Sequence, residues 1–191
     1  NTTASNNTAV GTGGLAANTT GTNNTAVGRS ALNANTTGTQ NTAVGKGAGS
    51  SITTGSYSVF IGDAAGDAVT TADSNVAVGQ NALTSTTTGT ANTAIGRQSL
   101  QINTTASNNT AVGHQTLLNN TGAGNTALGA FVLDANTTGT TNTGLGYAAL
   151  SSNTTAANNV AVGNSALLSN TTGANNVGVG DTALYANTTA S

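Results

Sequence analysis

The sequence predicts an all-β protein, a parallel β-solenoid (β-roll) of about eleven 17-residue coils with two short strands per coil. Three observations support this class: a fixed repeat length, an alternating pattern beside an invariant glycine, and a composition that disfavours helix. A unit repeated at constant spacing along the whole chain is typical of solenoids. The 191 residues include 26 Gly and are rich in Asn and Thr, which are poor helix formers.

A glycine recurs at one position of the repeat and defines its length. Successive copies lie 17 residues apart, except for a spacing of 16 between Gly113 and Gly129. Residues 1–191 are therefore a single continuous repeat array, and we expect a segment of a longer fibre because the sequence NTTAS both begins and ends it. We call the recurring residues the anchor glycines: Gly11, Gly28, Gly45, Gly62, Gly79, Gly96, Gly113, Gly129, Gly146, Gly163 and Gly180.

The residues before each anchor glycine alternate with a period of two. In NTAVG, residues 24–28, a β-branched Thr or Val is followed by a small residue and then by an aliphatic one. This alternation is typical of a half-buried strand. We therefore expect Thr25 and Val27 to face the interior, and the small residue between them to lie where chains pack against one another.

Two positions of the repeat hold only small residues, for different reasons. The anchor glycine is never replaced, even by Ala, which indicates a corner with positive φ or a close backbone approach. A second position holds Gly in some coils and Ala in others, as at Gly21 and Ala72. Because Ala is accepted there, we attribute this restriction to limited space.

Asparagine precedes nearly every predicted strand. The position is Asn in ten coils, including Asn24 and Asn41, and Ser58 in the remaining one. A side-chain amide can both donate and accept hydrogen bonds, so stacked copies can bond to one another. We expect these residues to form a ladder along the rod.

A second Asn position opens each NTT segment, and we expect it to point inward as well. Two adjacent coils carry Gly49 and Gly66 at the fourth position after the anchor glycine, where the other nine coils carry Leu. In the same coils the Asn is replaced by Ile52 and Val69. This exchange predicts that both positions fill one interior space.

The residue after each anchor glycine varies most along the array. Five of the eight charged residues occupy it, so we expect it to face solvent. We call this position the corner column, and it consists of Thr12, Arg29, Lys46, Asp63, Gln80, Arg97, His114, Ala130, Tyr147, Asn164 and Asp181.

The composition disfavours several classes of function. Lys and Arg total three, too few for the basic footprint of a nucleic-acid-binding protein. The sequence contains no apolar run of the ~18 residues that a membrane-spanning helix needs, so we expect no membrane insertion. The only histidine, His114, lies in the exposed corner column, which argues against a Ser-His-Asp centre. The sequence thus predicts no enzyme, no catalytic residues and no cofactor.

The acidic run GDAAGDAVTTAD contains the one candidate metal site. Asp63, Asp67 and Asp73 offer carboxylates of the kind that Ca²⁺ prefers. Their spacing matches neither an EF-hand nor a Gly-rich Ca²⁺ repeat, so the alternative is a set of solvated loop charges.

Twelve Asn-x-Thr triplets are candidate glycosylation sites. Ladder positions filled by Asn and Thr would produce the same triplets without any glycan, so both interpretations stay open. The Asn residues are Asn1, Asn6, Asn18, Asn23, Asn35, Asn103, Asn108, Asn119, Asn136, Asn153, Asn170 and Asn187.

The motif NTAVG-x-x-AL, present at residues 24–32, resembles the head repeats of trimeric autotransporter adhesins. The longer unit that begins at Asn24 and runs through Asn35 is similar to repeats of phage-type tail fibres and bacterial surface fibres. The resemblance covers all eleven units, although the adhesin repeats are shorter than the 17 residues found here. It implies left-handed parallel β-rolls assembled as trimers, a role in surface attachment or host binding, and no catalysis.

We therefore expect a structural extracellular fibre segment, a rigid spacer, adhesin shaft or filament subunit on a cell or virion surface. We expect it to self-associate, as a trimer or as an end-to-end filament. The alternative is an adhesin head that binds a carbohydrate or a surface receptor directly through the corner column.

Overall fold

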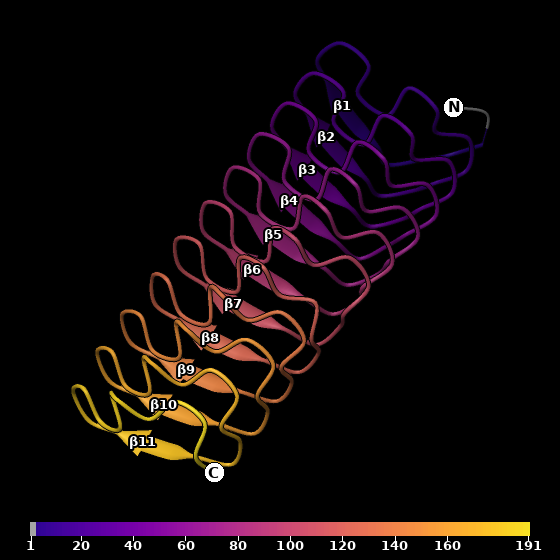
Figure 1. Ribbon diagram of the computed structural model, residues 1–191. Coiled ribbons are helices and arrows are strands. Elements are labelled where there is room, and N and C mark those ends of the chain that lie inside the picture. The colour runs from indigo at the N-terminus through magenta and orange to yellow at the C-terminus, as the bar shows by residue number, and fades with distance from the viewer. Residues whose placement is uncertain (1–2) are drawn as a thin grey trace.

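The chain folds as one stack of coils, which confirms the predicted β-solenoid (Figure 1). The structure is a computed structural model that describes residues 3–191. Each coil contributes one three-residue strand that ends just before an anchor glycine. The strands are β1 (Thr8–Val10), β2 (Thr25–Val27), β3 (Thr42–Val44), β4 (Val59–Ile61), β5 (Val76–Val78), β6 (Thr93–Ile95), β7 (Thr110–Val112), β8 (Thr126–Leu128), β9 (Thr143–Leu145), β10 (Val160–Val162) and β11 (Val177–Val179).

The strands form a single parallel sheet in sequence order, from β1 to β11. Equivalent residues pair across neighbouring coils, as Thr25 does with Thr42. The shorter coil between β7 and β8 keeps this register, because Thr110 pairs with Thr126. The missing residue is therefore absorbed outside the strands.

The second strand that we expected in each coil is absent from residues 3–191, where turns and bends occupy the rest of the coil. Hydrogen bonds between coils nevertheless continue around these turns. The Leu32 amide donates to the Ala48 carbonyl at 3.0 Å, and the Thr36 amide donates to the Thr53 carbonyl at 2.9 Å. The coils are thus joined on every side, but through turns rather than through a second sheet.

The side chains of the strands point in the opposite directions from those we expected. The middle residue is buried in ten of the eleven strands, as at Ala26 and Ala43, and the flanking Thr25 and Val27 point outward. The expectation that the small residue contacts other chains is therefore wrong as well. The physical reason is the narrow interior: Leu32 and two Asn side chains, Asn35 and Asn41, already fill it from the other walls.

The anchor glycines make the corner that the sequence predicts. Their φ angles lie between 116° and 141°, a region that favours glycine. A Cβ added to Gly11 would lie 2.8 Å from the carbonyl group of Gly28 in the next coil. Positive φ and a close backbone approach therefore both restrict this position to glycine. At the second small position, Gly21 has no left-handed φ and is crowded by the next coil, which confirms the limited space.

A column of leucines also adopts left-handed φ, which the sequence analysis did not anticipate. Leu32 has φ 49° and is fully buried. Bulky residues rarely adopt this conformation, so packing of the side chain must outweigh the backbone cost. The column consists of Leu15, Leu32, Leu83, Leu100, Leu117, Leu133, Leu150, Leu167 and Leu184.

Gly49 and Gly66 replace leucine in this column because Phe60 occupies the space between them. A Cβ at either glycine would overlap the Phe60 ring. Ile52 and Val69 are fully buried, as expected for the inward NTT position. The volume lost with the two leucines, however, is filled mainly by Phe60.

We predict that Gly66→Ala destabilises the rod through a clash with Phe60. Overpacking of this kind costs roughly 1–3 kcal/mol, measured as the free energy of unfolding in denaturant. Gly124→Ala is the matched control, because Gly124 also has positive φ and its nearest side-chain neighbour, Thr141 Cγ2, lies at an ordinary 3.4 Å. Equal losses in the two variants would contradict the packing account.

Candidate functional site

The outward side of the sheet is the most regular surface of the rod. We call it the strand face and define it as the first and third residues of β1 to β11. The first residue is Thr or Val in every strand, and the third is Val, Ile or Leu. These residues lie in register along the rod because the strands pair without a shift.

The strand face combines exposed aliphatic groups with a complete lack of charge. Ile61, Ile95 and Leu145 expose 39–40% of their surface, although each belongs to a strand. Large contiguous apolar patches are uncommon on monomeric soluble proteins and mark interaction sites. The strand face is therefore the first candidate for an interaction surface.

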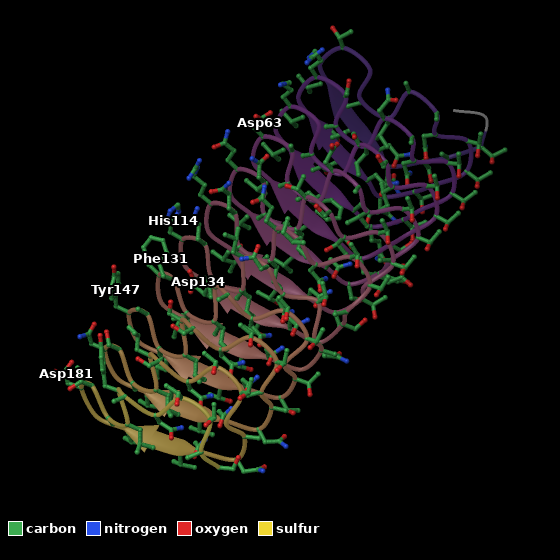
Figure 2. All side chains as sticks on the ribbon, viewed as in Figure 1. Asp63, His114, Phe131, Asp134, Tyr147 and Asp181 are labelled. Atoms are coloured by element: carbon green, nitrogen blue, oxygen red, sulfur yellow. The ribbon has the colours of Figure 1, made fainter. Side chains whose placement is uncertain are left out.

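The corner column lies along one edge of the rod, just beyond the ends of the strands (Figure 2). Most of its residues are exposed, as expected. Neighbouring coils exchange polar contacts there: Lys46 Nζ lies 3.6 Å from Asp63 Oδ1, and Arg97 Nε donates to Gln80 Oε1 at 3.3 Å. Both members of the Lys46–Asp63 pair are about half exposed, so the pair contributes little to stability.

Three aromatic rings meet on the same edge. His114 and Phe131 pack edge to face with ring centroids 5.4 Å apart, and Phe131 and Tyr147 do so at 5.9 Å. The sequence analysis placed His114 and Tyr147 in the corner column but missed Phe131, which lies one position further along its coil. The available signal was an aromatic residue within two positions of each of three successive anchor glycines, Gly113, Gly129 and Gly146.

The structure assembles neither a catalytic centre nor the candidate metal site from the predicted residues. The His114 ring has no hydrogen bond to a Ser, Thr or Asp within residues 3–191. Asp67 accepts a hydrogen bond from Ser50 Oγ, and Asp73 accepts one from the Ser56 amide at 2.7 Å. In the described part of the chain, groups of three or more potential metal ligands are absent. Asp63, Asp67 and Asp73 are thus engaged separately.

The expected Asn ladder before the strands is present, with a mixed bonding pattern. The backbone N–H of Asn41 donates to Asn24 Oδ1 at 2.9 Å, and the side-chain Nδ2 of Asn41 donates to the Gly55 carbonyl at 2.8 Å. Each side chain therefore joins neighbouring coils through backbone groups. Direct side-chain contacts occur only in part of the column, for example from Asn142 Nδ2 to Asn125 Oδ1 at 3.2 Å.

The NTT position forms a second, buried ladder made of amide-to-amide bonds. Asn153 Nδ2 donates to Asn136 Oδ1 at 2.7 Å and to the Ala156 carbonyl at 3.2 Å. The ladder stops where Ile52 replaces Asn, and Asn35 Oδ1 consequently finds no partner among residues 3–191. This ladder confirms that the NTT position points inward.

Membership of the NTT ladder separates the buried glycosylation candidates from the exposed ones. Asn18, Asn35, Asn103, Asn136, Asn153 and Asn170 belong to the NTT ladder and are buried. Asn187 belongs to the same ladder and is partly buried in the last coil. Asn1 lies outside the described residues. The exposed candidates are Asn6, Asn23, Asn108 and Asn119.

Comparisons with protein-family models, with curated proteins and with solved structures find no match to this chain. Residues 3–191 contain no helix with the length and apolar character needed to span a membrane. The described residues also form no enclosed pocket. The surfaces themselves, rather than a cavity, are therefore the candidate sites.

We predict that glycosylation, if the chain passes through a eukaryotic secretory pathway, is confined to exposed Asn residues in the folded product. Asn103 and Asn108 are a matched pair in one coil, because only Asn108 is exposed. Mass spectrometry of the secreted, folded protein should find glycan at Asn108 and none at Asn103. A folded product with glycan on Asn103 would contradict the buried ladder.

Proposed function

We propose that the chain is a segment of a structural fibre on the outside of a cell or virion, a rigid rod whose copies associate side by side along the strand face. The observation that carries this proposal is the uncharged strand face, whose row of Val, Ile and Leu continues through all eleven strands. Burial of such a surface is the main favourable term in protein association. The resemblance to adhesin heads and tail-fibre repeats supports the same role and location.

The size of the strand face is compatible with a stable contact between copies. Ten strand spacings of ~4.8 Å and a strand of three residues give a surface of roughly 48 by 10 Å. Two such surfaces would bury about 1,000 Å² in total, near the lower limit for a specific interface. Neighbouring side chains beyond the strands would add to this area.

The stack of coils supports the mechanical part of the proposal. Hydrogen bonds join each coil to the next in the strands and in the turns, so bending the rod requires many bonds to break together. Stability in such arrays grows with the number of coils. A rod of this kind can hold a binding element at a distance from the surface that carries it.

A second candidate function is direct binding of a ligand through the corner edge, as in an adhesin head. The specific observation that favours it is the group of three rings at His114, Phe131 and Tyr147. This edge is separate from the strand face, so the two functions do not exclude each other.

We predict that Ile95→Lys separates associated copies into monomers. Ile95 lies near the middle of the strand face and is 39% exposed, so the folded coil can accommodate the change. A lysine in each copy would place like charges in the buried contact. Sedimentation velocity should find oligomers for the wild type and monomers for the variant.

Thr105→Lys is the control, because Thr105 is exposed in the same region of the chain but lies outside the strand face. It should sediment as the wild type does. Circular dichroism would verify that both variants stay folded. A wild-type chain that remains monomeric at high micromolar concentration would refute association along the strand face.

A further inference from the structure

The ring cluster on the corner edge is built by an offset between successive coils. His114 and Tyr147 directly follow their anchor glycines, whereas Phe131 is the second residue after Gly129. Ala130 occupies the corner column between His114 and Tyr147, so no long side chain separates them. Phe131 lies in this space and contacts both rings (Figure 2).

The rings are accessible from solvent. Tyr147 is 57% exposed, and His114 and Phe131 are partly exposed. By contrast, Phe60 is fully buried and fills the interior. The chain contains only five Phe and Tyr residues, so the gathering of two of them with the single His on one edge is not explained by packing of the core.

Planar polar groups continue the same edge toward the N-terminus. Gln115 Nε2 donates to Gln98 Oε1 at 3.0 Å, and Arg97 Nε donates to Gln80 Oε1 at 3.3 Å. Each of these contacts uses one donor and one acceptor, so the groups keep further donors and acceptors for a ligand. Rings and amides together form a strip along five successive coils, roughly 20–25 Å long.

We infer that this strip, formed by Gln80, Arg97, Gln98, His114, Gln115, Phe131 and Tyr147, binds an extended polysaccharide of hexose units. The inference rests on the second candidate function, direct binding through the corner edge, and specifies its ligand. Aromatic faces carry negative potential, which attracts the C–H groups on the apolar face of a hexose. The amide and guanidinium groups match the hydroxyls of the next units along the chain.

The shape and charge of the strip favour this ligand over others. The described residues form no pocket at this edge, so a long chain that touches many coils can bind better than a small molecule that needs enclosure. Arg97 is the one permanently charged residue of the strip, and nucleic acid would require many more cations. None of the residues of the strip belongs to the strand face.

The test is isothermal titration calorimetry of the full chain with two probes. One probe is a β-1,4-linked glucose hexasaccharide, and the other is a β-1,4-linked mannuronate hexasaccharide. Binding of either probe is expected, and Tyr147→Ala and Phe131→Ala should each weaken it roughly 3- to 10-fold. Tyr147→Phe keeps the ring and should bind almost as the wild type does. The two probes distinguish neutral from acidic hexoses.

Tyr57→Ala is the matched control, because Tyr57 is 61% exposed but lies away from the cluster. It should leave the affinity unchanged. The inference is overturned if neither hexasaccharide binds, if Tyr57→Ala weakens binding as much as Tyr147→Ala, or if the strip binds only a protein. Sedimentation of the same variants shows separately whether copies associate, so failure of the inference and failure of the fibre proposal are distinguishable.

Discussion

The structure depends on hydrogen bonds that recur at the same positions between adjacent coils. The Thr25 amide donates to the Asn41 carbonyl at 2.8 Å, and the side chain of Asn153 donates to that of Asn136 at 2.7 Å. Unpaired polar groups are costly when buried. Every coil must therefore place its hydrogen-bond donors opposite the acceptors of the adjacent coil. A fixed coil length follows from this constraint, and so does the repetition of one residue type down each column.

Departures from the repeat show how strictly the constraint acts. Phe60 is accommodated only because glycine replaces leucine in the coils on either side of its ring. Similarly, Val132 takes the place of a small residue, and a Cβ at Gly144 would overlap it. In the coil that directly precedes the shorter one, the buried groups Asn103 Oδ1 and Asn109 Nδ2 find no partner among residues 3–191. A change in one coil is therefore matched in its neighbour or leaves a polar group unpaired.

Much of this architecture could be predicted from the sequence, because the period, the corner glycines and the two Asn columns follow from the spacing alone. Which side chains of each strand point into the interior could not be predicted from the sequence. Thr25 and Val27 have the larger side chains, and size suggested burial, whereas the interior has room only for Ala26 once Leu32 and the asparagines are inside. The left-handed leucines and the contact of Phe131 with both neighbouring rings also depend on neighbouring coils, which the pattern of one repeat does not contain. The strand face was therefore missed, while the exposed corner column was recognised from its variability.

The central claim is that buried asparagine ladders hold the rod together. NMR measurement of hydrogen exchange at the asparagine side-chain amides tests it most directly. Exchange requires opening of the structure, so buried and bonded groups should be protected. The account predicts slow exchange for Asn153 and Asn159, whose Nδ2 groups bond between coils, and fast exchange for the exposed Asn158 and Asn175. Equal exchange of all four side chains would contradict a rod held together by buried asparagine ladders.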